Sequence, residues 1–248
     1  MRAYTLISGS TSEVGHAVVR RLADGGALIL HGRDEAKLRS LLGSCSATFE
    51  HMVWVQDLNR PDEIAGSLGA LLAGGERAVE AFVHCAGVAH VLPARTAPLS
   101  AAMESFNINC ISAQQIVATL LKKRVNPSPL RNVAFISSIY SRVGVRAHSL
   151  YCASKAALDG LMRALAVELA PETRVNSILP GALDTAMARN AMSDPEIVRN
   201  LQSAYPLGIG YPKDVAAAVA FLLSEDSRWI TGQEIVIDGG RLVNFSLK

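Results

Sequence analysis

The chain has 248 residues, of which 50% are hydrophobic, 19% are charged and 5% are aromatic, and its formal net charge is +2. This length and this apolar content suit one large domain with a buried core. A charge so near balance argues against a nucleic-acid partner or an anionic membrane surface, and few aromatic residues leave little for base stacking. We therefore expect a single domain over residues 1–248 without a nucleic-acid partner.

The cysteines and the apolar segments indicate the compartment. The four cysteines show no CxxC pair and no histidine-rich spacing, so buried free thiols are favoured over disulfides or a metal site. No signal-peptide pattern follows the first residues, and no apolar run is long enough to span a membrane. We expect a cytoplasmic protein that makes no membrane contact and holds no metal.

Strand-like and helix-like segments alternate along the whole chain. Segments such as "ALIL" and "AFVHC" are apolar without alternation, which is typical of parallel strands covered by helices on both faces. The order predicts an α/β fold with a doubly wound, Rossmann-like parallel sheet of about seven strands. In chain order, we expect a strand at 3–8, a helix at 14–26, a strand at 27–32, a helix at 34–42, a strand at 51–57, a helix at 62–73, a strand at 78–87, a helix at 100–123, a strand at 132–138, a helix at 149–170, a strand at 174–181, a helix at 214–224 and a strand at 234–240.

Residues 182–211 form the least regular part of the chain and contain several prolines and glycines. They follow the carboxyl end of an expected strand, where loops of α/β proteins commonly bind ligands. We therefore predict a lid over the substrate at about 182–211.

The segment "SGSTSEVG" joins the first expected strand to the first expected helix. In such a glycine-containing turn, backbone N–H groups and the amino end of a helix bind the phosphates of a nucleotide. Glu13 stands where another glycine is expected, but an acid in the first helical turn is favoured by the helix dipole and can turn to solvent. We interpret Glu13 as a tolerated acid. The expected cofactor contacts in this turn are Gly9, Ser10, Thr11, Ser12, Glu13, Val14 and Gly15.

The segment "YCASK" places Tyr151 and Lys155 four residues apart on one face of an expected helix. An ammonium group nearby stabilises a phenolate and lowers its pKa, so the pair can move a proton to or from a carbonyl oxygen. Taken alone, such a pair is more often two ordinary surface side chains. Upstream, a strand ends in Ser137 and Ser138, and a hydroxyl there can donate to the same oxygen. Ser138 is the stronger candidate, since adjacent strand residues face opposite ways.

Together, the glycine turn, the serine and the Tyr–Lys pair resemble the short-chain dehydrogenase/reductase family in its single-domain form. Further motifs extend the resemblance over nearly the whole chain: "HCAG", "FNINC", "LPGALDT" and "WITGQEIVIDGG". In style the chain is similar to 3-oxoacyl carrier-protein reductases. "HCAG" departs from the NNAG of the family because His84 and Cys85 replace both asparagines. A lone histidine at a strand end is more often a satisfied core residue than a catalyst.

The resemblance implies roles for four residues. Tyr151 would be the catalytic acid or base, and Lys155 would lower its pKa and bind the nicotinamide ribose. Ser138 would polarise the substrate carbonyl. Asn109 would hold a water that relays protons to Lys155, with Asn107 as its rival. The further cofactor contacts implied are Asp57, Leu58, Ala86, Gly87, Pro180, Gly181, Leu183 and Thr185.

The residues after the second expected strand bear on which nicotinamide cofactor is used. Relatives that prefer NAD often carry an acid there that binds the ribose 2′-hydroxyl. This chain has Gly32 at that position and Arg33 next to it, which suits a 2′-phosphate, so NADP(H) is favoured and NAD(H) remains possible. Asp34 is expected to cap the following helix.

The reaction implied is reduction of a ketone to a secondary alcohol by hydride transfer from NADPH. The substrate would be a small ketone or an acyl thioester on a carrier protein. The alternative is a non-catalytic dinucleotide-binding regulator or scaffold. The two long helices suggest a homodimer or homotetramer, as in relatives. The basic residues near an expected carrier site are Lys122, Lys123, Arg124 and Arg131, although Pro129 and Glu172 stand where such relatives often have basic side chains.

Overall fold

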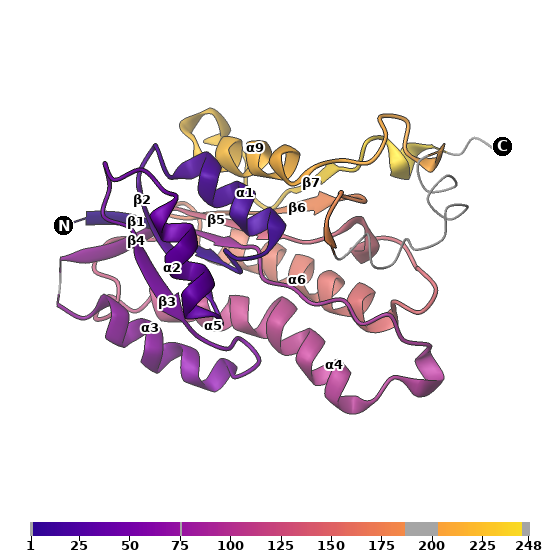
Figure 1. The fold of residues 1–248 in the computed structure, drawn as a ribbon, viewed down its shortest axis with the longest axis horizontal. Coiled ribbons are helices and arrows are strands. Elements are labelled where there is room, and N and C mark those ends of the chain that lie inside the picture. Colours follow the sequence, from indigo (N-terminus) through magenta and orange to yellow (C-terminus); the bar gives the residue numbers. More distant parts are fainter. Residues whose placement is uncertain (1, 75, 187–202, 245–248) are drawn as a thin grey trace.

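The computed structural model describes residues 2–74, 76–186 and 203–244, and it confirms the doubly wound α/β fold. All seven strands run parallel in one sheet of order β3-β2-β1-β4-β5-β6-β7 (Figure 1). The chain order of the expected strands is therefore correct, and their bounds shift by only a few residues. The strands are β1 (Arg2–Ser8), β2 (Ala27–Gly32), β3 (Met52–Val55), β4 (Arg77–His84), β5 (Asn132–Ile136), β6 (Arg174–Pro180) and β7 (Glu234–Ile237).

Helices cover both faces of this sheet (Figure 1). Neighbouring strand residues therefore enter different cores: Leu6 and Phe82 pack in one apolar cluster, and Ile7 and Val83 pack in the other. This is why the strands show no polar–apolar alternation. The first face carries α3 (Ile64–Leu72), α4 (Leu99–Phe106), α5 (Ser112–Leu120) and α6 (Ser149–Glu168), and the second carries α1 (Glu13–Leu22), α2 (Glu35–Gly43) and α9 (Pro212–Leu223).

The helix expected at 100–123 is not one regular α-helix. A π-helical segment, η3 (Asn107–Ile111), separates α4 from α5. A π turn inserts a residue into the helical ladder and is frequent at functional sites. Its position could not be read from a pattern of apolar residues, because one inserted residue changes that pattern little.

The turn after β1 demands two glycines. Gly9 has a φ of +67°, and a Cβ there would lie 2.7 Å from the Cα of Ala86. A Cβ at Gly15 would lie 2.1 Å from the carbonyl oxygen of Gly9. The left-handed backbone and these approaches explain why glycine occupies both positions.

Other expectations have mixed outcomes. All four cysteines are free thiols, but only Cys85 is buried, and Cys45, Cys110 and Cys152 are half-buried. No helix in the described part of the chain is long and apolar enough to cross a membrane. Residues 187–202 of the predicted lid lie outside the described residues, so the lid stays a prediction.

Two histidines at strand ends are buried. His31 in β2 and His84 in β4 are 2% and 0% exposed, and burial lowers their pKa values to about 4 and about 3. The charged imidazolium form is disfavoured there because it loses its hydration. Both side chains are therefore neutral in the folded protein at ordinary pH.

These shifts predict sensitivity to acid. An unfolded histidine binds a proton near pH 6.5, whereas the folded ones resist protonation until about pH 4 and about pH 3. The free energy of unfolding is therefore unaffected by these histidines above about pH 6.5 and falls as the pH drops below it. For the pair, the fall between about pH 7 and about pH 5 is about 4 kcal/mol. Urea unfolding of the wild type and of the double variant His31→Gln/His84→Gln over this range measures it. An equal fall in both proteins would contradict the prediction.

Candidate active site

A cavity of about 220 Å³ opens at the carboxyl ends of β1, β2 and β4. In doubly wound sheets this is the edge at which ligands bind, next to the point where the strand order reverses. Eight of the predicted cofactor contacts line it: Gly9, Thr11, Ser12, Arg33, Asp57, Leu58, Ala86 and Gly87. The structure thus brings together residues from four separate segments of the chain.

The remaining turn residues lie around this cavity without lining it. Ser10 is fully buried; its hydroxyl donates to the carbonyl of Ile7 and accepts from the backbone N–H of His31. Val14 packs against an apolar cluster. The side chains of Ser10 and Val14 therefore support the turn from behind. Ser12 caps α1 by accepting from the N–H of Gly15 at 3.0 Å.

Glu13 reaches across to the segment that follows β6. Its Oε2 accepts a hydrogen bond from the backbone N–H of Ala186 at 2.6 Å. The interpretation of Glu13 as merely a tolerated acid is therefore incomplete. The carboxylate connects the turn after β1 to the start of the predicted lid.

At the end of β2, no acidic side chain faces the cavity. Gly32 and Arg33 line it, and Arg33 is exposed. Asp34 caps α2, as expected, by accepting from the N–H of Lys37 at 3.1 Å. Arg33, directly after β2, is thus the charged residue at this end of the cavity lining.

Tyr151 and Ser138 lie together beyond the end of β5. Burial raises the pKa of Tyr151 to about 12, and a hydrogen bond with Ser138 opposes this rise. The direction is opposite to that predicted from the spacing of Tyr151 and Lys155, because desolvation of the phenolate outweighs the nearby donors. Ser137 points elsewhere, since its hydroxyl donates to the carbonyl of Lys155 at 3.4 Å. Ser138 is therefore the serine that faces Tyr151.

Lys155 is 3% exposed and lies one turn after Tyr151 in α6. Its ammonium donates to the carbonyl of Ile136 at 2.8 Å and lies 5.8 Å from the ring centroid of Tyr151. Burial lowers its pKa to about 8, while the charge of Asp159 raises it. A Cβ on Gly87 would lie 3.3 Å from Nζ, so the ammonium borders the cavity.

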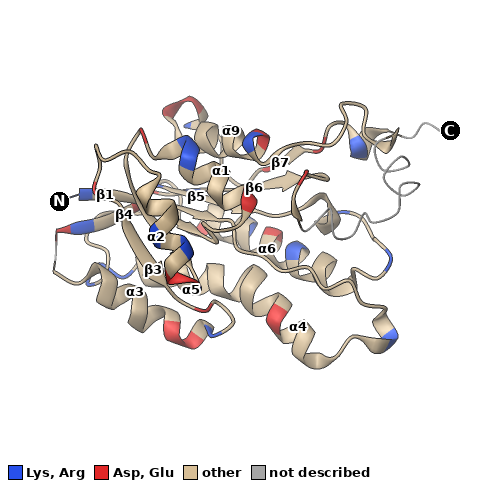
Figure 2. Cartoon of the chain, viewed as in Figure 1, with Lys and Arg blue, Asp and Glu red and all other residues tan. Residues whose placement is uncertain are grey.

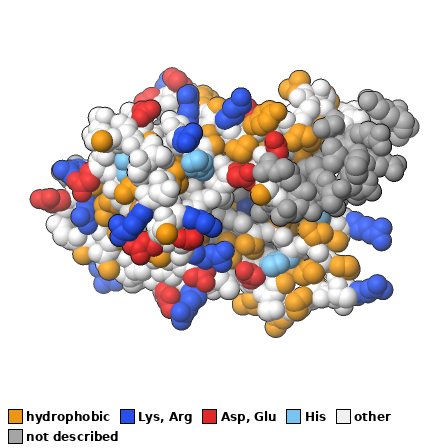
Figure 3. Space-filling model, viewed as in Figure 1, with side chains coloured by type: hydrophobic (Ala, Val, Ile, Leu, Met, Phe, Trp, Pro, Cys, Tyr) orange, Lys and Arg blue, Asp and Glu red, His pale blue; other side chains and the backbone are white. Residues whose placement is uncertain are grey.

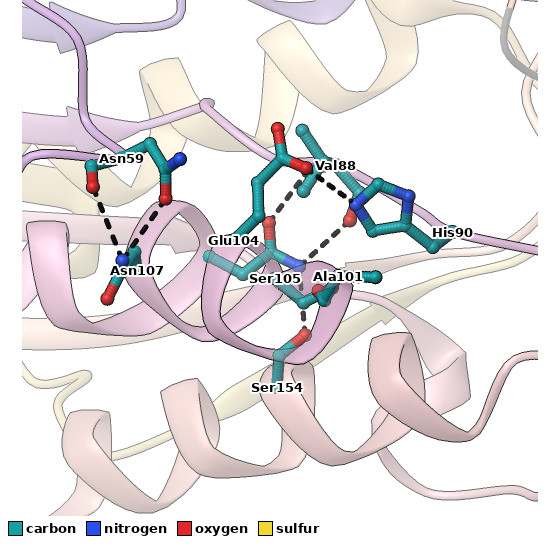
Figure 4. A network of polar contacts seen from close by, with 9 residues as sticks. Asn59, Val88, His90, Ala101, Glu104, Ser105, Asn107 and Ser154 are labelled. Atoms are coloured by element: carbon teal, nitrogen blue, oxygen red, sulfur yellow. Dashed lines mark hydrogen bonds and ion pairs between the residues drawn. The ribbon is translucent and has the colours of Figure 1, made fainter. Parts of the chain in front are cut away.

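Asn109 lies in the π segment and is fully buried. Its Oδ1 accepts from the N–H of Val88, and its Nδ2 donates to the carbonyl of Val88 and to the hydroxyl of Ser154. Both amide N–H groups are therefore used in holding the loop after β4 against α6. Asn107 donates instead to Asn59 at the surface, away from Val88 and Ser154 (Figure 4).

The predicted contacts after β6 bond to β7 and to the segment 205–210. Gly181 donates its N–H to the carbonyl of Ile237, and the N–H of Ala182 donates to the hydroxyl of Tyr205. Leu183 pairs with Gly210 in an isolated bridge, and the hydroxyl of Thr185 donates to the carbonyl of Leu183 at 3.5 Å. These predicted contacts, together with Pro180 at the end of β6, lie outside the lining of the 220 Å³ cavity.

Four lining residues were not among the predicted cofactor contacts: His31, Gly32, Val88 and Ile108. Val88 and Ile108 resemble ordinary core residues in a pattern. His31 follows four apolar residues in the expected strand, and its position near the end of that strand was the signal that could have marked it.

Charged side chains of both signs are spread over the surface of the molecule. Lys and Arg are interspersed with Asp and Glu over the molecule (Figure 2). Within the described ranges, no group of three or more His, Cys, Asp or Glu could hold a metal ion. The basic residues considered for a carrier, Lys122 to Arg131, precede β5 and so lie at the amino edge of the sheet, opposite the cavity.

Comparison with known proteins agrees with this geometry. The model of the family described as "Enoyl-(Acyl carrier protein) reductase" matches residues 9–241. L-xylulose reductase of Bos taurus is 33% identical over 243 residues, covering 96% of this chain and 95% of that protein. Carbonyl reductase (NADPH) 2 of Sus scrofa is 31% identical and covers 96% of each.

A solved short-chain dehydrogenase/reductase from Mycobacterium ulcerans has the same fold, with a TM-score of 0.86 and 28% identity. The match covers 98% of this chain and 90% of that one. The chain belongs to the short-chain dehydrogenase/reductase family and is an NAD(P)-dependent oxidoreductase acting on CH–OH and C=O groups.

Proposed function

We propose that the protein reduces a small ketone to a secondary alcohol with NADPH, with Tyr151 as the general acid. The observation that carries this proposal is the grouping of Tyr151, Ser138 and Lys155: Tyr151 shares a hydrogen bond with Ser138, and the Lys155 ammonium lies 5.8 Å from the Tyr151 ring centroid and borders the cavity at Gly87. Gly9 has no side chain, and the open space over its turn fits the pyrophosphate of a dinucleotide. A bound nicotinamide supplies the hydride that adds to the carbonyl carbon.

The protein side chains handle the proton. Ser138 donates a hydrogen bond to the carbonyl oxygen, and Tyr151 donates its proton to the same oxygen as negative charge develops there. A raised pKa keeps Tyr151 protonated before the reaction, as a general acid requires. Lys155 stabilises the phenolate left behind and binds the nicotinamide ribose.

Asn109 acts in this proposal mainly by holding the loop after β4. Its two N–H groups are already engaged, so only Oδ1 keeps an acceptor position for the water expected to relay protons to Lys155. Val88, which Asn109 holds on both its N–H and its carbonyl, lines the cavity.

Tyr151→Phe tests the assignment. The variant removes only the transferable proton, so the turnover number should fall by about a hundredfold to ten-thousandfold. NADPH binding, measured by fluorescence, should change little because the ring remains. Tyr4→Phe, a buried tyrosine in β1 far from the cavity, is the control. Retained turnover in Tyr151→Phe would refute the role, and binding of NADPH with no turnover on any ketone by the wild type would favour the regulator or scaffold.

NADP(H) rather than NAD(H) is the preferred cofactor in this proposal. Arg33 lines the cavity beside Gly32, and the carboxylate of Asp34 is occupied in capping α2. A guanidinium there binds a 2′-phosphate through charge-assisted hydrogen bonds. The name of the porcine carbonyl reductase, which specifies NADPH, points the same way.

Arg33→Ala should therefore raise the KM for NADPH by about tenfold to a hundredfold. The KM for NADH should change less than about threefold, because NADH has no phosphate to lose a partner. Arg39→Ala removes the same charge from α2 where the side chain pairs with Glu35, and it should leave both KM values unchanged. Equal effects of Arg33→Ala on both cofactors would contradict the preference.

Glu13 has opposing effects on this cofactor. Glu13 follows Ser12, which lines the cavity, and its negative charge disfavours a nearby pyrophosphate. Its hydrogen bond with Ala186, however, orders the segment after β6.

Glu13→Gln separates these effects, since the amide oxygen can still accept from Ala186 while the charge is removed. We expect NADPH to bind about twofold to fivefold more tightly. Glu13→Ala, which also removes the acceptor, should lose this gain. Fluorescence titration measures both dissociation constants, and weaker binding by Glu13→Gln would show that the charge itself is needed.

The substrate proposed is a small, polar ketone. The ring centroid of Tyr140 lies 6.2 Å from that of Tyr151 and 5.5 Å from that of His148. Tyr140 and His148 both carry hydrogen-bonding groups. The L-xylulose and D-erythrulose reductases among the relatives are named for such ketones. A carrier-borne acyl thioester is less favoured, because the basic cluster at 122–131 lies at the opposite edge of the sheet.

Self-association into a dimer or tetramer is part of the proposal. Hydrophobic side chains gather over α4 on the face shown in Figure 3. Leu99 and Met103 of this helix are 77% and 52% exposed. Burying them against a second copy would remove apolar surface from water.

A further inference from the structure

Two histidines flank the end of β1, one from each neighbouring strand. His31 belongs to β2 and His84 to β4, the two strands that pair with β1. Ser8, the last residue of β1, is the register partner of His84. Gly9, which follows Ser8, begins the turn that the proposed function assigns to the pyrophosphate.

Each imidazole makes one contact with this end of β1. The Nδ1 of His31 accepts from the N–H of Gly9 at 3.1 Å. The Nδ1 of His84 lies 2.7 Å from the hydroxyl of Ser8. The segment Ser8–Gly9 is thus held on both flanks by ring nitrogens.

The second nitrogen of each ring contacts a backbone carbonyl elsewhere. The Nε2 of His31 lies 3.0 Å from the carbonyl of Gln56, and the Nε2 of His84 lies 3.1 Å from the carbonyl of Ile108. A carbonyl can only accept, so Nε2 carries the proton in both rings and both Nδ1 atoms are acceptors. If His31 were doubly protonated, its Nδ1–H would face the N–H of Gly9, and two donors cannot form a hydrogen bond.

The surroundings hold both rings in place. The ring of His31 packs on Trp54, with centroids 4.7 Å apart. The ring of His84 packs on Phe82 and Phe135, with centroids at 5.9 Å and 6.3 Å. Both rings therefore lie among aromatic side chains as well as between their hydrogen-bond partners.

The two carbonyl groups that the Nε2 atoms contact lie in different segments around the cavity. Gln56 precedes Asp57 and Leu58, which line the cavity. Ile108 lies in the π segment next to Asn109, and it lines the cavity as well. His31 therefore joins the glycine turn to the loop after β3, and His84 joins β1 to the π segment that holds the loop after β4.

We propose that His31 and His84 are positioning residues, His31 for binding of the cofactor at the glycine turn and His84 for the catalytic step through the π segment. This proposal rests on the proposed function, because it assumes that NADPH binds at Gly9. Neither histidine touches substrate in it. Each fixes a backbone group, the N–H of Gly9 or the carbonyl of Ile108, whose position the site requires.

The test compares leucine variants, which keep an apolar side chain but remove both hydrogen bonds. His31→Leu should raise the dissociation constant for NADPH by about tenfold, with the turnover number at saturating NADPH within about threefold of wild type. His84→Leu should lower the turnover number by about tenfold and change NADPH binding less than about threefold. His31→Gln, which keeps one acceptor and one donor, should restore most of the binding.

His51 provides a matched control. Its Nδ1 accepts from the N–H of Leu28 at 3.1 Å, and its Nε2 lies 3.1 Å from the carbonyl of Ser46, the same pattern at the amino edge of the sheet. His51→Leu should lower the melting temperature without changing NADPH binding or turnover. If His31→Leu and His84→Leu change only the melting temperature, as His51→Leu does, the proposal is wrong.

Nitrogen NMR of the wild type gives a test that requires no variant. Both rings should be neutral with the proton on Nε2 between about pH 6 and about pH 8. A proton on Nδ1 of either ring would overturn the proposal. Failure of the wild type to bind NADPH would refute the proposed function and this inference with it, whereas equal binding by the wild type and His31→Leu would refute only the role of His31.

Discussion

The close approach of β1 to β4 at their carboxyl ends is the constraint on which the rest of the site depends. At Gly9 a Cβ would collide with the backbone of Ala86, and at Gly15 a Cβ would collide with the carbonyl of Gly9. Because both positions lack side chains, α1 starts directly against the end of β1. The cavity forms in the space that the missing side chains leave. In the loop after β4, which contains Ala86, Gly87 lies next to the ammonium of Lys155.

Burial of polar groups is the second feature that runs through the site. Lys155, Asn109, His31 and His84 are all buried, and each has its hydrogen bonds directed to backbone groups or to a serine. Water cannot replace these partners, so each side chain has one arrangement. The same burial moves the pKa of Lys155 from 10.5 down to about 8 and that of Tyr151 from 10.0 up to about 12, so it separates two values that nearly coincide in water and favours the neutral form of both groups.

Much of this was predictable because it is local. Apolar runs marked the strands, Asp34 marked the start of α2, and the four-residue spacing placed Tyr151 and Lys155 on one face of α6. Tertiary contacts account for the errors. The lowered pKa expected for Tyr151 followed from its neighbour in the helix, whereas desolvation by the whole site decides the direction. Glu13 was judged from its own helix, yet its partner is Ala186, 173 positions away in the chain.

The succession of strands and helices, the glycine turn and the family of the chain can be read from the amino-acid sequence, because each depends on residue types at short spacings. The tertiary structure alone decided the π turn at Asn107–Ile111, the engagement of the Asn109 amide with Val88 and Ser154, and the two histidines beside β1. Those features depend on which strands and loops become neighbours in space. A histidine at a strand end has the same pattern whether it faces solvent or a backbone N–H, and only the neighbouring strands distinguish the two.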